Sequence, residues 1–445
     1  MFTKSGSGGR NDGTRNSSLA ALLAFGMVLA LAVIPTSLTA SGSDETVSAD
    51  DAKCLKCHSK QMKKSMDDGA KMSLHVTASD FADSVHSAIG CTSCHRDIAD
   101  RKHPKEKITI SDQRSYSVQM NQACGRCHEE KAKQYDGSIH ARLVAEGSEA
   151  APVCTNCHTA HAVKEMAVFE SVTGEVCKTC HEPIFEAYAQ SVHGEARASG
   201  NVIRDSHIQA PLCADCHRAH DVSAVSAEEL VQSTCLSCHD DASQAHEQWL
   251  PNANHHLEVV ACAACHTPMA ERRIDLQLYD KLTKVPMGNE ENHAPFQQRL
   301  DEVDKAGDGL DPVELWKLIR RTSQEGQATD VTLRGRMEVS TGADAHRIAA
   351  KGSAVRECDS CHEQGSAAFQ KVTVSIARPD GRKQRFDADS DVLTSPVSLD
   401  SVGNFYAAGG TRIAVLDWLL ILAILAGLAV PIGHITIGKI LNRKK

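Results

Sequence analysis

The sequence predicts a mainly α-helical fold with much coil, a small β-hairpin near residues 372–386 and one C-terminal transmembrane helix. Three observations lead to this prediction. All 18 cysteines of the 445-residue chain fall into nine C-x-x-C-H units, which are typical of short helical turns. Aromatic residues make up only 4% of the chain, too few for an ordinary core of this size. An apolar run long enough to cross a bilayer lies close to the C-terminus.

The C-x-x-C-H unit is the attachment site for c-type haem: two thiols add to the porphyrin vinyl groups, and the adjacent histidine is the proximal ligand of the iron. The chain's own cysteine and histidine frequencies predict about 0.04 such units by chance. Zinc sites and disulfides would use the cysteine pairs, but neither needs a histidine directly after every pair. The sequence therefore predicts nine covalently bound haem c groups, which would also supply the apolar bulk that aromatic side chains do not.

The predicted attachment residues follow directly from the motifs. The thioether cysteines are Cys54, Cys57, Cys91, Cys94, Cys124, Cys127, Cys154, Cys157, Cys177, Cys180, Cys213, Cys216, Cys235, Cys238, Cys262, Cys265, Cys358 and Cys361. The proximal ligands are His58, His95, His128, His158, His181, His217, His239, His266 and His362. The 57 acidic and 48 basic side chains give a net charge of −9, which argues against a nucleic-acid partner.

The N-terminus has the features of a secretory signal. Lys4, Arg10 and Arg15 precede an apolar run from Leu19 to Ile34, and proline and small residues follow. We expect residues 1–42 to be a cleaved signal peptide, with an uncleaved signal anchor as the alternative.

The C-terminus has the features of a membrane anchor. Residues 411–438 contain the apolar run, and a basic tail follows at 439–445. Because positive residues stay on the cytoplasmic side, we expect a single span in a bacterial inner membrane with the haem domain in the periplasm. A buried core helix is the alternative. His434 near the inner end is either an interfacial residue or a ligand to a b-type haem shared with a partner.

Repeated phrases divide the chain between these ends. FADSVH (81–86), YDGSIH (135–140) and YAQSVH (188–193) share an aromatic residue, a serine and a final histidine at the same spacing. This repetition predicts an eight-haem array in four pairs over residues 43–275. Residues 276–345 are expected to form a haem-free insert with one helix, in which Asp311 and Glu314 make a capping box. Residues 346–410 hold the ninth haem and short strands.

Two stretches place a second histidine close behind the motif: CTNCHTAH ends at His161 and CADCHRAH ends at His220. His220 is one helical turn from His217, on the same side of that porphyrin, and cannot reach the opposite face of the same iron. We therefore predict that His161 and His220 bind neighbouring haems. The full set of predicted distal ligands is His86 with His75 or His103 for the first pair, His140 and His161 for the second, His193 and His220 for the third, His246 with His255 or His256 for the fourth, and His346 for the ninth haem.

One motif departs from this pattern. Met269 stands after CAACH at the position that His161 and His220 occupy in their modules. A methionine ligand would raise the reduction potential of its haem. A packing methionine is the alternative.

The nine motifs and the S-[VI]-H phrases, over roughly residues 50–365, resemble the periplasmic multihaem c-type cytochromes of anaerobic respiration that have doubled C-x-x-C-H modules. The C-terminal anchor resembles that of the cytochrome c subunits of quinol-oxidising cytochrome bc-type complexes. The resemblance implies electron transfer between the quinone pool and periplasmic c-type cytochromes, through a b-type cytochrome or another quinone-reactive membrane subunit. Small quinol dehydrogenases of nitrate and nitrite respiration differ, because they anchor at the N-terminus.

Three functions compete at this stage. The first is electron transfer alone, with no catalytic residue. The second is an enzyme acting on nitrite, hydroxylamine or tetrathionate, which needs one iron with an open position. Nitrite reductases often mark that iron with C-x-x-C-K, and this chain has no such unit. The third is a scaffold for a membrane complex.

Overall fold

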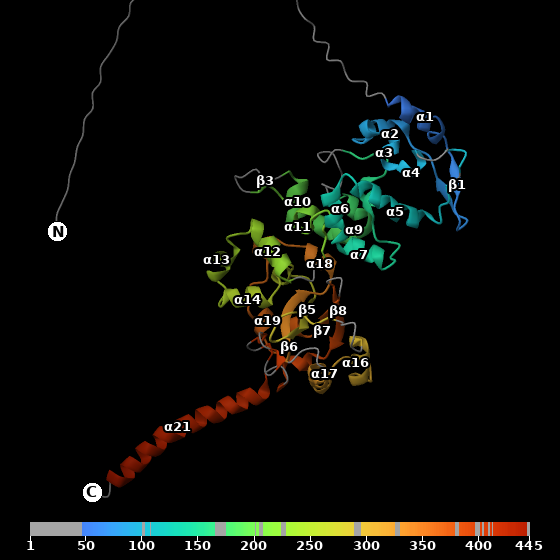
Figure 1. Ribbon diagram of the computed structural model, residues 1–445. Coiled ribbons are helices and arrows are strands. Elements are labelled where there is room, and N and C mark those ends of the chain that lie inside the picture. The colour runs from blue at the N-terminus through green and yellow to red at the C-terminus, as the bar shows by residue number, and fades with distance from the viewer. Residues whose placement is uncertain are drawn as a thin grey trace, which may run out of the picture. The chain divides into compact units, whose positions relative to one another are not determined.

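The computed structural model describes residues 47–442 except for 100–102, 107, 165–174, 201, 204–207, 224–227, 289–294, 325–329, 379–381, 397–400, 403–404, 408–409 and 412 (Figure 1). The predicted signal peptide and the last three residues of the basic tail lie outside the described residues.

The part of the chain that carries the first eight motifs is made of short helices, long connections and two small β-hairpins (Figure 1). Its elements in order are α1 (Ala49–His58), β1 (Lys63–Ser65), β2 (Lys71–Ser73), α2 (Ala78–Ala82), η1 (Ser87–Ile89), α3 (Cys91–Cys94), α4 (Arg96–Ala99), α5 (Gln113–Gly125), α6 (Glu129–Asp136), α7 (Ile139–Ala145), α8 (Cys154–His158), α9 (Glu175–Ala189), α10 (Val192–Ala198), β3 (Val202–Ile203), β4 (Ile208–Gln209), α11 (Cys213–His217), α12 (Glu228–Cys238), α13 (Ala242–Glu247), α14 (Ala253–Val259) and α15 (Cys262–His266).

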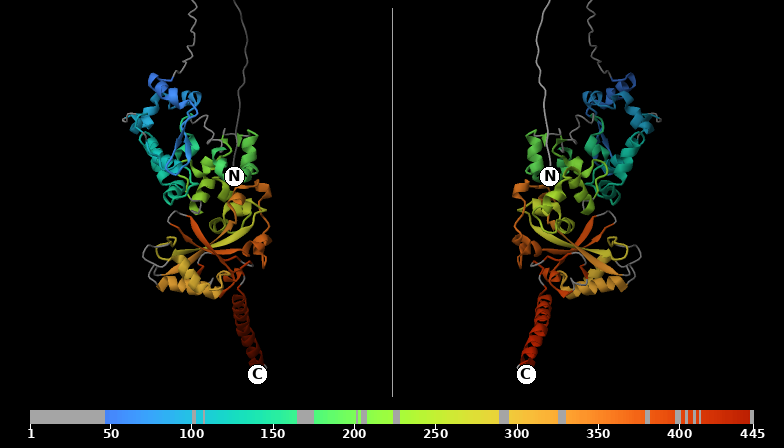
Figure 2. Two further views of the ribbon diagram at one scale, coloured as in Figure 1. Left: turned by 90° about the vertical axis from the view of Figure 1, so that its right-hand side faces the viewer. Right: turned by 90° about the vertical axis from the view of Figure 1, so that its left-hand side faces the viewer.

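A four-stranded sheet follows, with strand order β6-β5-β7-β8 (Figure 2). The strands are β5 (Arg272–Asp280), β6 (Val331–Val339), β7 (Val372–Ala377) and β8 (Lys383–Ala388). β5 pairs antiparallel with β6 and parallel with β7, and β7 pairs antiparallel with β8. The hairpin expected near 372–386 is therefore confirmed as β7 and β8, but it belongs to a larger sheet.

Strands β5 and β6 were not expected, because the sequence analysis assigned only a helix to residues 276–345. Both strands show the alternation that predicts a half-buried strand. In β5, Ile274, Leu276 and Leu278 are fully buried on one face, and charged or polar residues separate them. The β6 residues Leu333 and Met337 lie opposite Leu278 and Ile274 and extend this apolar face.

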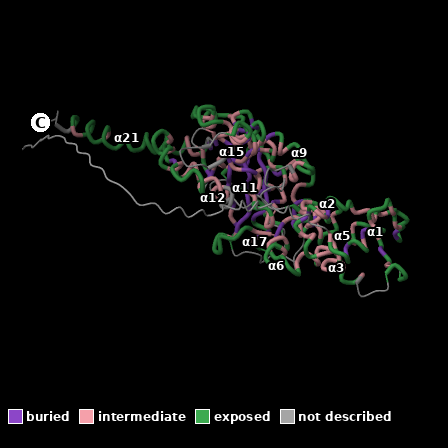
Figure 3. Tube along the Cα trace, turned by 90° about the horizontal axis from the view of Figure 1, so that it is seen from above, coloured by how far each residue is buried: buried purple, intermediate pink, exposed green. Residues whose placement is uncertain are grey.

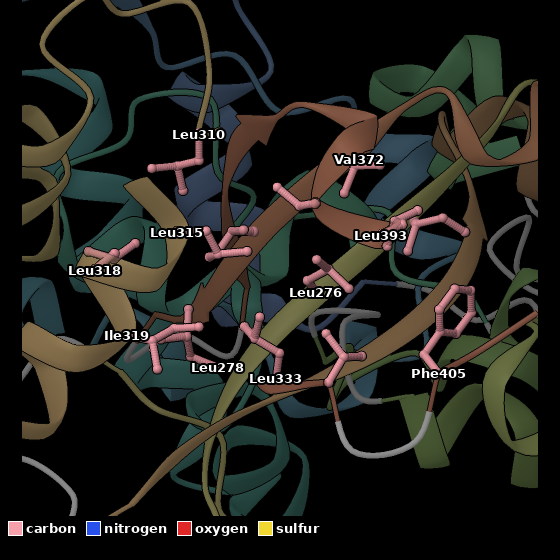
Figure 4. Packing of buried hydrophobic residues seen from close by; sticks show 14 of the residues in the cluster. Leu276, Leu278, Leu310, Leu315, Leu318, Ile319, Leu333, Val372, Leu393 and Phe405 are labelled. Atoms are coloured by element: carbon pink, nitrogen blue, oxygen red, sulfur yellow. The ribbon is translucent and has the colours of Figure 1, made fainter. Parts of the chain in front are cut away.

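The hydrophobic core lies on that face of the sheet (Figure 4). Helices α16 (Phe296–Val303) and α17 (Pro312–Gln324) contribute buried side chains to it, among them Leu315 and Leu318. The members of the cluster span residues 259–405, so the core belongs to the sheet and not to the first seven motifs. Figure 3 shows buried residues concentrated in the middle of the tube and few along the segment from α1 to α6.

The predicted cap of α17 is confirmed. The Asp311 carboxylate accepts hydrogen bonds from the backbone N–H groups of Val313 and Glu314, both at 2.7 Å. The Glu314 carboxylate accepts one in return from the Asp311 N–H at 3.1 Å. This reciprocal pair is a capping box with proline at the first helical position.

The remaining elements of the C-terminal part are α18 (Gly342–His346), η4 (Lys351–Ser353), α19 (Asp359–His362), η5 (Ala367–Phe369), η6 (Ser390–Leu393) and α21 (Ala414–Asn442). Helix α21 includes a stretch, Val415–Ile440, that is long and apolar enough to cross a bilayer and has none of its window buried inside the protein. It begins three residues after, and ends four residues after, the bounds predicted from the sequence.

The opposite face of the sheet carries a buried network of charges. Lys383 on β8 donates to Asp275 on β5 at 2.8 Å and to Glu338 on β6 at 3.1 Å. The side chains of Asp275 and Lys383 are 0% and 1% exposed. Burial alone raises the pKa of Asp275, but the charges of Lys383 and Arg385 and their hydrogen bonds outweigh it, so that this pKa lies below its usual range. Asp275 is thus ionised and paired.

Replacing Lys383 with methionine should destabilise the sheet strongly, because it leaves the Asp275 carboxylate buried without its closest cation. Breaking a buried pair in this way costs about 3 kcal/mol or more. The matched control is Lys281→Met, since Lys281 pairs with Asp330 at 3.0 Å but both side chains are more than half exposed. We expect that variant to lose less than about 1 kcal/mol. Denaturant unfolding followed by far-ultraviolet circular dichroism measures both, and equal losses would contradict the prediction.

Candidate haem-attachment sites

Each C-x-x-C-H motif lies on a helix or directly at a helix end, and we number the sites one to nine in chain order. One helical turn separates the first cysteine from the histidine: the N–H of the motif histidine donates to the carbonyl of the first cysteine in His95, His128 and His362, at 2.8–3.0 Å. Both thiols and the imidazole therefore project from a single turn, as a covalently attached porphyrin requires.

The motif histidine often leaves helical geometry. His95, His128 and His181 have φ between −113° and −96° and ψ between 41° and 55°. A new helical segment starts directly afterwards, at α4, at α6 and in the second part of α9. The chain thus turns at the histidine, which re-aims the imidazole relative to the helix that bears the cysteines.

Every motif histidine lies beside one histidine from outside the motifs, with ring centroids 5.7–6.5 Å apart. In order of site the pairs are His58–His103, His95–His161, His128–His86, His158–His220, His181–His140, His217–His346, His239–His193, His266–His246 and His362–His256.

This spacing fits an iron between the two rings. A metal–imidazole bond of about 2.0 Å, added to about 1.1 Å from the nitrogen to the ring centre, would place two opposite ligands about 6.2 Å apart between centroids. His217 and His346 are the closest pair, with 3.4 Å between their Nε2 atoms. Two metal–nitrogen bonds of about 2.0 Å each would place these two atoms about 4.0 Å apart.

Hydrogen bonds at Nδ1 fix the orientation of several rings. Nδ1 of His58 lies 2.9 Å from the Leu74 carbonyl, and Nδ1 of His246 and His346 lies 2.7 Å from the carbonyl four residues earlier in the chain. A carbonyl oxygen only accepts, so each Nδ1 carries a proton, and a neutral ring with its proton there keeps the lone pair of Nε2. That tautomer is the one in which Nε2 binds a metal.

Burial favours the neutral form of several other histidines in these pairs. Desolvation lowers the pKa of His95, His161 and His217, and neighbouring histidines lower it further. Because a metal ligand must be unprotonated, this environment favours the binding form.

The repeated S-[VI]-H phrases start the helices that carry two of the non-motif histidines. Ser138 and Ser191 are buried, and each hydroxyl caps its helix by accepting a hydrogen bond from a backbone N–H three residues later, at 3.2 and 3.1 Å. His140 and His193 follow in the first turn of α7 and α10. The serine therefore sets where the helix begins and, with it, the direction of the histidine.

The same phrases dock onto distant segments. In each, the Val or Ile N–H donates to a carbonyl two residues after another non-motif histidine: Val85 to Val163 at 3.0 Å, Ile139 to Val222 at 2.8 Å and Val192 to Ile348 at 2.8 Å. The accepting segments share the pattern A-H-x-[VI]. This docking explains why a second histidine follows two of the motifs so closely in sequence. His161 and His220 belong to docking segments and lie in sites two and four, away from the histidines of their own motifs.

The order of the distal histidines differs from the order expected. The structure places His86, His140 and His193 in sites three, five and seven, one pair of motifs further along than predicted. It places His161 and His220 in sites two and four, one pair earlier than predicted, and His256 in site nine instead of the fourth pair. His346 was expected beside the ninth motif. It lies in site six instead, because the Ile348 carbonyl accepts a hydrogen bond from the Val192 N–H, in the same way as the carbonyls of the other two docking segments. The shared A-H-x-[VI] pattern was the sequence signal for this and was missed.

His75 and His255 lie outside the nine pairs. His75 follows Leu74, whose carbonyl lies 2.9 Å from Nδ1 of His58. The ring beside His58 is that of His103, with centroids 6.2 Å apart. On helix α14, His255 faces Glu258 at 3.8 Å, whereas His256 lies beside His362. His207 and His293 lie outside the described residues.

Met269 is 93% exposed. The ring beside His266 is that of His246, with centroids 6.3 Å apart.

The thiols show how the sites adjoin. Within successive pairs of motifs the first cysteines are in hydrogen-bonding contact: Cys54 with Cys91, Cys124 with Cys154, Cys177 with Cys213 and Cys235 with Cys262. Between the pairs, the second cysteine of one motif is an electrostatic neighbour of the next motif: Cys94 of Cys124, Cys157 of Cys177, Cys216 of Cys238 and Cys265 of Cys361. The nine sites therefore adjoin in chain order.

One cation lies between the last two sites. The positive charge of Arg272 acts on both Cys265 and Cys361 and opposes the rise that burial causes in the pKa of each thiol. Its guanidinium donates to the carbonyl of Ala264, inside the eighth motif, at 2.8 Å.

Comparison with known protein families agrees with this geometry. Residues 77–159 match the family model for cytochrome c7 and related cytochrome c, and residues 148–240 match the model for cytochrome c3. No curated protein and no solved structure matches the chain. The matched residues include motifs two to seven. The chain is a multihaem c-type cytochrome with cytochrome c7-like and c3-like regions, which carries several covalently bound haem c groups and transfers electrons.

Proposed function

We propose that this cytochrome is a nine-haem, membrane-anchored electron carrier that connects a quinone-reactive membrane subunit with periplasmic c-type cytochromes in anaerobic respiration. One observation carries the proposal: each of the nine motif histidines has a second histidine at the spacing that an iron with two axial imidazoles needs. Haem c bound in this way supplies a one-electron couple, with no position left for a substrate.

The protein's own residues account for the rest of the proposed activity. The two histidines of each pair would hold one haem iron between them. The contacts between successive motifs keep neighbouring sites close. Helix α21 supports the membrane location, with its apolar stretch from Val415 to Ile440 and Lys439 near the inner end. A quinone-reactive partner follows from the resemblance of this anchor to those of cytochrome bc-type complexes.

The test is electron paramagnetic resonance of the oxidised holoprotein, with haem additions counted by mass spectrometry. We expect nine additions and only low-spin ferric signals, because two imidazoles give six-coordinate iron. A high-spin signal equal in amount to the protein would mean an open iron and would overturn the proposal in favour of an enzyme.

Replacing His103 with alanine should convert one haem to a high-spin form, because it removes the histidine opposite His58. The matched control is His75→Ala, a histidine close in sequence that lies outside the pairs. We expect its spectrum to stay low-spin. If the His75 variant became high-spin and the His103 variant did not, the assignment at site one would be reversed.

Replacing Arg272 with glutamine should lower the reduction potential of one or both of the last two haems, because the cation disfavours the added positive charge of ferric iron. A unit charge at this range shifts a potential by something on the order of 50 mV. Redox titration followed by absorbance measures the shift, and Arg272→Lys, which keeps the charge, should restore most of it. A purely structural role would give equal changes in both variants.

A further inference from the structure

The nine sites form a series with two ends. Among the described residues, each cysteine of one motif that neighbours a cysteine of another joins a site to the next one along the chain, from Cys54 and Cys91 at one end to Cys265 and Cys361 at the other. Site one and site nine are therefore the terminal members, and an electron that passes through the whole series enters at one of them and leaves at the other.

The segment that leads into the membrane helix lies against site nine. A Cβ placed on Gly410 would be 2.5 Å from the carbonyl oxygen of Cys361 and 2.6 Å from Cε2 of Phe369. Real Cβ atoms do not approach that closely, so only glycine allows the chain to pass this near to the ninth motif. The contact is made four residues before α21 begins at Ala414.

Two residues between Gly410 and the helix, Thr411 and Ile413, are buried. Thr411 is 1% exposed, and its backbone N–H donates to the Ala407 carbonyl at 3.0 Å. Ile413 is 2% exposed, and its carbonyl accepts from Leu416 in the first turn of α21. The five residues from Gly410 to the start of the apolar stretch at Val415 reach at most about 17 Å.

We propose that site nine is the terminus at the membrane surface, where the chain exchanges electrons with its membrane subunit, and that site one is the terminus that serves a periplasmic carrier. The inference rests on the proposed function and adds the identity of the two terminal sites. Helix α21 would hold site nine near the bilayer surface, because the chain passes against Cys361 at Gly410, four residues before this helix begins.

Acidic side chains surround the ninth motif. Glu357, Asp359 and Glu363 are exposed, and Arg356 is the exposed cation beside them. This acidic edge fits a membrane subunit that surrounds its own redox group at the outer surface of the bilayer with basic side chains.

The experiment measures which haem is closest to the lipid headgroups. The oxidised full-length holoprotein is placed in phosphatidylcholine vesicles that contain a nitroxide-labelled headgroup lipid, and the relaxation enhancement of the nitroxide by ferric haem is recorded. This enhancement falls so steeply with distance that the closest haem dominates it. Two variants are compared: Cys358→Ser with Cys361→Ser, which lacks haem nine, and Cys54→Ser with Cys57→Ser, which lacks haem one.

Loss of haem nine should remove most of the enhancement, and loss of haem one should leave it unchanged. A larger effect from loss of haem one, or equal effects, would overturn the inference. A third variant tests the distance without removing a haem, in case loss of a haem disturbs the fold. It carries a Gly-Ser spacer of about ten residues after Ile413, which spans roughly 17 Å and should reduce the enhancement. The same spacer in the exposed loop at Gly307 should not. None of these readings requires electron flow, so their outcome is separate from the spin-state test of the proposed function.

Discussion

The array depends on one backbone contact, which is repeated three times. An N–H from an S-[VI]-H phrase donates to a carbonyl in an A-H-x-[VI] segment that lies 78 to 156 residues further along, as from Val85 to Val163 and from Val192 to Ile348. Each such bond fixes two histidines that belong to different sites. Because the modules interlock in this way, the position of each iron depends on at least two modules, and the array holds together as one unit.

Electrostatics divides the chain into two kinds of structure. In the sheet, the buried charges of Asp275 and Lys383 are paired with each other within the polypeptide. Around the motifs, neutral imidazoles and thiols face one another, and burial lowers the pKa of histidines such as His95 and His161. The sheet follows the rules of an ordinary core. The motif region is arranged for a group that carries its own apolar surface and charge.

The sequence predicts the motif residues, the cap at Asp311 and the hairpin of β7 and β8 because each depends on neighbours within a few residues. It does not predict that His346 lies beside His217, because the two residues meet only through the docking of Ile348 on Val192. Strands β5 and β6 are separated by 50 residues, so their pairing leaves no local sign beyond alternation. Features that depend on neighbouring residues can be predicted from the sequence, but contacts between distant segments cannot.

The uneven distribution of the core has a consequence for biogenesis. The hydrophobic cluster spans residues 259–405, and the segment before it has only scattered buried side chains such as Leu55, Phe81 and Val153. The sheet has the means to fold as a bare polypeptide, whereas the module region lacks enough buried apolar area to offset the chain entropy it loses. Attachment of haem is then the event that folds this region. Before haem is attached, we therefore expect a chain whose C-terminal sheet is folded and whose module region is not.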